Sequence, residues 1–199
     1  MTATPWRPTA EEIAAGYGRA IPDVVAANLR VLFCGINPGL YSGATGRHFA
    51  RPGNRFWRSL HLAGFSDREL TPWDDADMLA AGFGVTNLVN RATATAAELS
   101  PTELRAGADR LLATAERYRP GMVAVVGISA YRLAFERPKA TIGRQAERLA
   151  PSGLWVLPNP SGLNAHYQLP ALAEAFRQLF DSSSPSSIGS SASRPSTLM

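Results

Sequence analysis

The sequence contains one cysteine and one lysine among its 199 residues, and no long apolar run. The single thiol, Cys34, cannot form an intrachain disulfide, and no cysteine–histidine grouping has the spacing of a zinc or iron–sulfur site. No stretch reaches the roughly 18 apolar residues that a membrane-spanning helix needs. Residues 1–19 contain two glutamates and no apolar core, so they do not resemble a signal peptide. These absences favour a cytoplasmic protein with no metal, no other cofactor and no membrane partner.

Acidic residues are also missing from one long segment. Residues 24–66 contain five arginines and two histidines but no aspartate or glutamate. Since the net charge of the whole chain is only +4, this uneven placement is more informative than the total. A basic block favours an anionic ligand such as a nucleic acid, although a solvated surface rich in arginine would have the same composition.

The length and composition indicate one folded domain followed by a polar tail. An apolar fraction of 45% is enough for a single hydrophobic core. Residues 181–199 contain nine serines, two prolines and few apolar side chains, which is typical of a disordered segment. We therefore expect a single domain over residues 1–180 and a disordered tail after it.

Short apolar runs alternate with helical patterns along this domain. Strands are expected at residues 30–36, 84–89, 121–127 and 153–158, and helices at residues 9–16, 54–63, 71–81, 101–118, 129–135 and 165–180. Continuously apolar strands separated by helices form parallel sheets covered on both faces. The predicted fold class is therefore α/β, a three-layer α/β/α arrangement around a mostly parallel sheet of four to five strands. Residues 37–52 are expected to form a long functional loop.

Asparagines lie at the ends of several of these strands. Asn37 follows the first strand, Asn87 and Asn90 lie at the end of the second, and Asn159 follows the last. Ligands of parallel α/β sheets bind at the carboxyl ends of the strands. Amides orient water and read hydrogen-bonding edges, but they are not strong bases. Such residues suit a reaction with a largely dissociated transition state, for example cleavage of an N-glycosidic bond through an oxocarbenium-like sugar.

Other catalytic motifs are missing from the sequence. It contains no phosphate-binding loop, no dinucleotide-binding glycine motif after a strand and no nucleophile elbow. The only lysine, Lys139, lies in a distant predicted loop, so a Schiff-base lyase reaction is not expected. The histidines His48, His61 and His166 are expected to be surface residues or phosphate contacts.

Three segments together resemble the mismatch-specific uracil-DNA glycosylase family, which includes thymine-DNA glycosylases. They are residues 35–40 (GINPGL), 46–57 (GRHFARPGNRFW) and 159–163 (NPSGL), and the resemblance extends over roughly residues 28–180. It implies the uracil-DNA glycosylase fold and a monofunctional enzyme that acts in base excision repair without a cofactor. The implied partner is double-stranded DNA in which uracil, thymine or a modified pyrimidine is opposite guanine. Nothing in the sequence requires more than a monomer.

The resemblance also implies roles for the residues of a base pocket. Asn37 would position the attacking water at the sugar C1′ atom, and Phe49 would stack on the flipped base. Backbone groups of Ile36 and Phe49 would contact the uracil edge, and Ser42 would lie beside the pyrimidine C5 atom. The full set of predicted pocket residues is Ile36, Asn37, Gly39, Ser42, Phe49, Asn87 and Asn159.

A second set of residues would bind the DNA around the flipped nucleotide. Leu163 would fill the gap left in the helix, and backbone groups of Ser161 and Gly162 would read the widowed guanine. The other predicted DNA-binding residues are Arg47, Arg51, Arg55, Asn164 and His166. His166 stands near the place where related proteins often have a basic residue. Asn87 corresponds to an asparagine that reads the uracil edge in more uracil-specific relatives, and we interpret it in the same way.

Two other functions remain open from the sequence. One is a nucleic-acid-binding module that has lost catalysis, and the other is a small nucleoside hydrolase on the same scaffold. Asn37 argues against the first, whereas Leu163 and the arginine-rich segment favour a polymer over a free nucleoside. Binding to duplex DNA should weaken steeply with salt if several phosphates are contacted.

Overall fold

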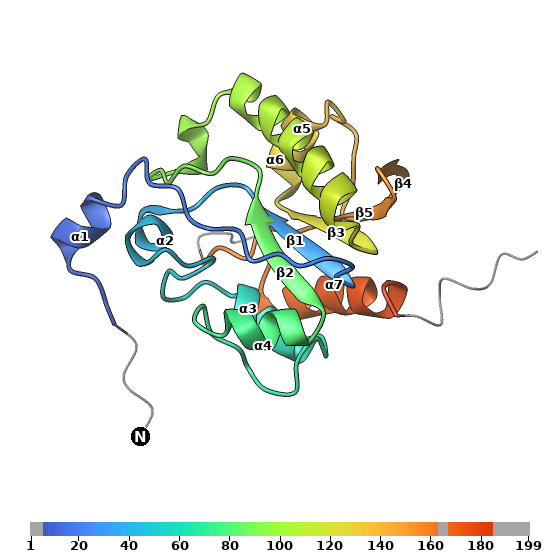
Figure 1. The fold of residues 1–199 in the computed structure, drawn as a ribbon, viewed down its shortest axis with the longest axis horizontal. Coiled ribbons are helices and arrows are strands. Elements are labelled where there is room, and N and C mark those ends of the chain that lie inside the picture. Colours follow the sequence, from blue (N-terminus) through green and yellow to red (C-terminus); the bar gives the residue numbers. More distant parts are fainter. Residues whose placement is uncertain (1–5, 163–166, 185–199) are drawn as a thin grey trace, which may run out of the picture.

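The computed structural model describes residues 6–162 and 167–184 (Figure 1). A five-stranded sheet in the order β2-β1-β3-β5-β4 forms its centre. The strands are β1 (Val31–Gly35), β2 (Phe83–Asn87), β3 (Met122–Val126), β4 (Gly143–Leu149) and β5 (Ser152–Leu157). The first three and β5 are parallel, and β4 pairs antiparallel with β5 at one edge. The prediction of a mostly parallel α/β sheet is confirmed.

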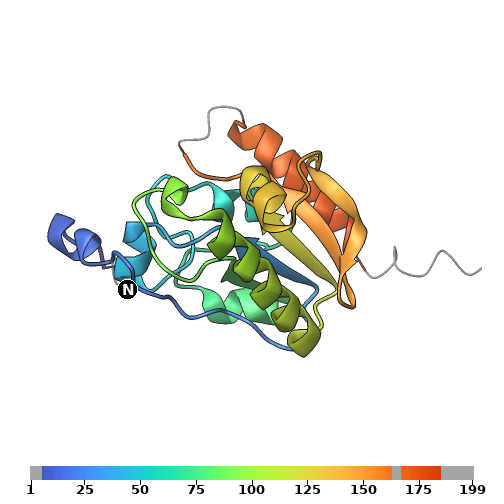
Figure 2. The same cartoon turned by 90° about the horizontal axis from the view of Figure 1, so that it is seen from above.

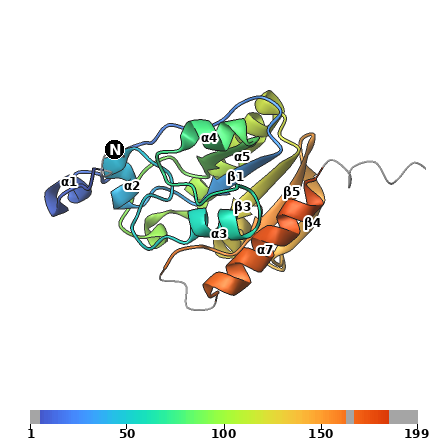
Figure 3. The ribbon, with the colours of Figure 1, turned by 90° about the horizontal axis from the view of Figure 1, so that it is seen from below.

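Helices cover both faces of this sheet. They are α1 (Ala10–Ala14), α2 (Leu40–Thr45), α3 (Phe56–Leu62), α4 (Asp75–Ala80), α5 (Pro101–Tyr118), α6 (Ile128–Ala134) and α7 (Leu169–Ser182), with a short 3-10 helix at Ala96–Glu98. Helices α5 and α6 lie on one face, and α3, α4 and α7 lie on the other (Figures 2 and 3). Helices α1 and α2 lie beyond one end of the sheet (Figure 1). No helix of the described residues is long and apolar enough to cross a membrane.

The alternation of side chains along β1 produces two hydrophobic cores. Val31 and Phe33 join the cluster under α3 and α7, whereas Leu32 and Cys34 join the cluster under α5 and α6. All five residues of β1 are buried because the strand is covered on both faces. Burial also raises the pKa of the Cys34 thiol, so this cysteine serves as an apolar core residue.

The structure differs from the predicted helices and strands in three places. The sequence pattern does not predict strand β4, because it is a polar edge strand whose first six residues alternate between half-buried and exposed positions. Helix α2 lies inside the predicted loop 37–52. Helix α7 starts at Leu169 and ends at Ser182, whereas the predicted helix extends over residues 165–180. Residues 163–166 and 185–199 lie outside the described residues.

Helix α5 determines where the end of β2 lies. Its first turn has a capping box in which Ser100 and Glu103 exchange hydrogen bonds. In the middle of the helix, a Cβ atom on Gly107 would lie 2.4 Å from the backbone oxygen of Leu88. One turn later, the Arg110 guanidinium donates to the backbone oxygens of Asn87 and Leu88. The helix therefore packs directly on the main chain that carries Asn87.

This close approach makes replacement of Gly107 by alanine a test of the packing. Alanine favours an isolated helix over glycine by about 1 kcal/mol. In this fold we expect Gly107→Ala to lower the free energy of unfolding by about 1–3 kcal/mol, because the added methyl group overlaps a backbone oxygen. Chemical denaturation measures the difference. The exposed neighbour Ala106 gives the control, since Ala106→Gly reports only helix propensity. A more stable Gly107→Ala variant would contradict the packing.

Candidate active site

A cavity of about 1020 Å³ opens where β1, β2, β3 and β5 end. The chain leaves β1 toward β2 on one side and later returns to β3 on the other, and a crevice forms where the order of the strands reverses in this way. The predicted residues that line the cavity are Ile36, Asn37, Gly39, Ser42, Phe49, Arg51, Asn87, Asn159 and Ser161. The strand ends thus bring together residues that are up to about 120 positions apart in the sequence.

The Asn37 amide has a defined orientation in this cavity. Its Nδ2 lies 3.1 Å from the backbone oxygen of Pro38, 3.0 Å from that of Arg91 and 2.7 Å from Oγ1 of Thr93. Backbone oxygens only accept hydrogen bonds, so the amide atom that faces them must be the nitrogen. The amide oxygen is therefore the atom of Asn37 that can accept a hydrogen bond from a bound molecule.

Thr93 is a site residue that the sequence analysis did not identify. Its hydroxyl donates to the backbone oxygen of Thr95 at 2.8 Å and therefore accepts from Asn37. Its backbone N–H donates to Pro38, which ties the loop after β2 to the loop after β1. Thr93 lies six residues beyond β2 in a segment with no apolar pattern, so only its position in space shows its role.

The end of β2 places the Asn87 amide over the end of β1. Asn87 is only 4% exposed, and its Nδ2 lies 3.2 Å from Nδ1 of His48. A Cβ atom on Gly35 would lie 2.5 Å from Oδ1 of Asn87, so the absence of a side chain at Gly35 allows this approach. His48 is itself 3% exposed, which corrects the expectation of a surface residue.

Phe49 has a backbone conformation that is unusual for a phenylalanine. Its φ angle is +50°, in the left-handed region, which side chains of this type rarely adopt. Its ring stacks on Phe56 with the ring centroids 4.0 Å apart. Ser42, which is buried, accepts a hydrogen bond from the backbone N–H of Ala50 at 3.2 Å and so supports the turn next to Phe49.

The loop after β5 is held by Arg55. Its guanidinium donates to the backbone oxygens of Pro160 at 3.3 Å, Ser161 and Tyr167 at 2.7 Å, on both sides of residues 163–166. At the start of the loop, Oδ1 of Asn159 accepts from the Ser161 N–H at 3.0 Å. Arg55 thus supports the loop through its backbone. The predicted DNA contacts Leu163, Asn164 and His166 lie outside the described residues.

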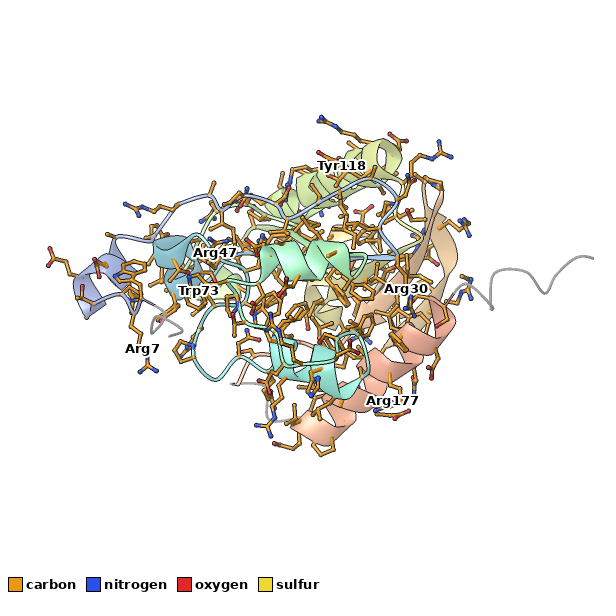
Figure 4. The ribbon with its side chains drawn as sticks, turned by 60° about the horizontal axis from the view of Figure 1, so that its bottom comes forward. Arg7, Arg30, Arg47, Trp73, Tyr118 and Arg177 are labelled. Carbon is orange, nitrogen blue, oxygen red and sulfur yellow. The ribbon has the colours of Figure 1, made fainter. Side chains whose placement is uncertain are left out.

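The other predicted DNA-binding residues of the described part of the chain differ in how they are placed. Arg51 lines the cavity, and Gly162 is packed close to the backbone of Gly53. Arg47 forms an ion pair with Asp75. It is labelled in Figure 4 on the side of the molecule near Trp73, away from Arg30, which lies beside α7. The basic segment 24–66 is therefore partly neutralised by an acidic residue from α4, which the sequence count did not anticipate.

Some candidate residues do not line the cavity and bond instead to the protein backbone. Oδ1 of Asn90 accepts from the backbone N–H of Ile21, and His61 Nδ1 lies 3.0 Å from the backbone oxygen of Ser66. Neither residue lines the cavity, and neither does Lys139.

The charges around the cavity indicate what it can do. No aspartate or glutamate of the described residues lines it, and in the same part of the chain no three histidine, cysteine or acidic side chains are grouped as metal ligands would be. The lining consists of amides, hydroxyls, apolar side chains, one arginine and the imidazole of His48. Such a site can orient water and a polar ring, and the lining has no carboxylate to repel a negatively charged leaving group.

Comparisons with known proteins agree with this geometry. The family model "Uracil DNA glycosylase superfamily" matches residues 22–181. A solved structure with a similar fold is the solution NMR structure of a proposed uracil DNA glycosylase from Methanosarcina acetivorans, with a TM-score of 0.58 and 18% sequence identity. The match covers 82% of this chain and 98% of that one. At this identity the structural match shows the fold, and the family model shows the relationship. The chain belongs to the uracil DNA glycosylase superfamily.

Proposed function

We propose that this protein is a monofunctional, mismatch-specific DNA glycosylase that hydrolyses the N-glycosidic bond of uracil opposite guanine and so begins base excision repair. Thymine and modified pyrimidines are the other proposed substrates. The orientation of the Asn37 amide carries this proposal. Three acceptors hold its Nδ2, so Oδ1 can accept a hydrogen bond from a water molecule next to a bound sugar.

The chemistry requires positioning more than activation. As the bond between C1′ and N1 of uracil breaks, its electron pair leaves with the base and the sugar becomes oxocarbenium-like. Water oriented by Asn37 adds to C1′ and then loses a proton to solvent, and the uracil anion takes up a proton from solvent after it leaves. The departing base carries negative charge, which backbone N–H groups of the surrounding loops would stabilise. A carboxylate in this place would oppose that charge, and the described lining has none.

We propose that Phe49, Asn87 and Ser42, which line the cavity, recognise the base. Phe49 would stack on the flipped uracil, and the Asn87 amide would read its hydrogen-bonding edge. Ser42 would face C5, where its small side chain leaves space. Flipping a base costs a few kcal/mol and costs least at a mismatch, which gives part of the selectivity. Leu163 in the loop that Arg55 holds would fill the gap left in the duplex.

Replacement of Asn37 tests the proposed catalytic residue. We expect Asn37→Ala to reduce single-turnover uracil excision from a U:G duplex at least about 100-fold, because the attacking water loses its orientation. DNA binding should remain. Asn90→Ala is the matched control, since it removes an amide that does not line the cavity and that accepts from the backbone N–H of Ile21, a residue of the cavity wall. Excision at the wild-type rate by Asn37→Ala would refute the assignment.

The proposed mismatch preference can be measured on labelled duplexes with U:G, U:A, T:G or C:G at one position, beside single-stranded uracil. After excision, alkali cleaves the strand at the abasic site. We expect cleavage at U:G well above U:A, because the mispair is easier to open. Equal cleavage of U:G, U:A and single strands would contradict the proposed mismatch specificity but would support the proposed glycosylase activity. No cleavage in any lane would favour a binding module or a nucleoside hydrolase.

Leu163 provides a separate test of base flipping. We expect Leu163→Ala to slow excision from duplex DNA about tenfold or more while single-stranded excision changes little, since only a duplex has a gap to fill. The comparison uses the same uracil-containing strand with and without its complement. A similar loss on both substrates would exclude the wedge.

A further inference from the structure

His48 forms hydrogen bonds through both ring nitrogens. Its Nε2 lies 3.0 Å from the backbone oxygen of Pro22, and its Nδ1 lies 3.2 Å from Nδ2 of Asn87. Because a backbone oxygen only accepts, Nε2 must carry the hydrogen. In the neutral ring, Nδ1 is then an acceptor. The Pro22 contact therefore selects the tautomer that accepts a hydrogen bond from Asn87.

The surroundings of His48 favour this neutral form. Burial is the largest effect and lowers the pKa of His48 below its ordinary value, so the ring is uncharged at neutral pH. The bond to Pro22 and the charges of Asp23 and Asp75 act in the opposite direction but are weaker. Both aspartates have arginine partners: Asp23 lies 3.5 Å from Arg110, and Asp75 pairs with Arg47.

An acceptor at Nδ1 permits only one orientation of the Asn87 amide. Nδ2 faces His48, Oδ1 lies over Gly35, and Asn87 itself lines the cavity. The backbone of Asn87 is also fixed, since its oxygen accepts from Arg110. The groups of Asn87 that remain for a bound base are therefore the amide oxygen and one N–H. Their positions cannot be exchanged, because the other N–H faces His48.

We infer that His48 is a positioning residue that fixes the Asn87 amide so that the pocket accepts uracil and rejects cytosine. This inference rests on the proposed function. Uracil offers an N–H at N3 and an oxygen at C4, whereas cytosine offers a bare nitrogen at N3 and an amino group at C4. Turning the amide by 180° would exchange its donor and acceptor and fit cytosine instead. His48 opposes that turn, because Nδ1 would then face the amide oxygen with no hydrogen between them.

The test uses the full-length protein and two DNA duplexes that differ only in the target base. Uracil or cytosine is placed opposite an abasic-site analogue, so that pairing does not differ between the two substrates. Single-turnover excision gives a uracil-to-cytosine rate ratio for the wild type, His48→Leu and His48→Gln. His61→Gln is the matched control, because His61 also bonds to a backbone oxygen but lies outside the cavity.

We expect the ratio to be at least about 1000 in the wild type, since a base with the wrong edge leaves buried polar groups unpaired. Leucine removes the acceptor, so His48→Leu should lower the ratio at least about tenfold. Glutamine retains one donor and one acceptor at its end, so His48→Gln should keep most of the discrimination.

Acidity gives a second measurement that does not depend on whether His48→Leu folds. Protonation puts a hydrogen on Nδ1, which then repels the Nδ2 group of Asn87 and favours the turned amide. Because burial lowers the pKa of His48, the wild-type ratio should stay constant from about pH 8 to about pH 6.5. It should decrease only as the pH falls further, toward about 4.5, and that of His48→Gln should not decrease. His61→Gln should follow the wild type.

Two failures are distinguishable. If the wild type releases uracil but the ratio changes neither in His48→Leu nor with pH, His48 does not position the amide and the inference is wrong. Equal losses of uracil and cytosine excision in His48→Leu, with a wild-type ratio that does not change with pH, would show a purely structural role and would also overturn it. If the wild type releases uracil from no duplex, including U:G, the proposed function itself fails and the inference falls with it.

Discussion

The central position of β1 between β2 and β3 is the constraint on which the site depends. Parallel pairing of β1 with both neighbours aligns their carboxyl ends at one edge of the sheet, and β5 follows through β3. Asn37, Asn87 and Asn159 are thereby brought to one cavity although they are far apart in the chain. A parallel sheet buried on both faces has little freedom to change its register, because the apolar residues of β1, β2, β3 and β5 pack into one of two cores.

Around this edge, hydrogen bonds from the protein determine how each amide can be used. Asn37 has its nitrogen fixed by two backbone oxygens and Thr93, and Asn87 has its nitrogen on His48. An amide in water exposes both its donor and its acceptor, so it distinguishes poorly between ligands that donate and ligands that accept a hydrogen bond. Once one end is occupied by the protein, the other end has a single chemical character toward a ligand. The orientation of these amides therefore depends on Thr93, His48 and nearby backbone oxygens as well as on the asparagines themselves.

Several arginines also hold the backbone segments that carry these amides, which their number in the sequence does not reveal. Arg110 holds the end of β2, Arg55 holds the loop after β5, and Arg91 pairs with Glu103, next to the backbone oxygen that Asn37 contacts. The Arg91–Glu103 pair lowers the pKa of Glu103 to about 2. Arginine suits this task because its planar group donates several hydrogen bonds in fixed directions. The basic character of the chain thus serves folding as well as any contact with an anionic ligand.

The sequence by itself determined the elements with strong local signals: four apolar strands, the capped helix α5, and the Asn-Pro turns that follow β1 and β5. Apolar runs and caps are local properties, and a buried strand next to a turn former can be recognised without its neighbours. Only the tertiary structure decided which strands pair and which side chains form hydrogen bonds with one another. The edge strand β4 has no apolar pattern, Thr93 lies in an irregular segment, and His48 becomes buried only because β2 and the segment containing Pro22 close around it. Hydrogen bonds between residues 39 positions apart, such as His48 and Asn87, leave no local signal because they depend on how the chain returns to the same edge of the sheet.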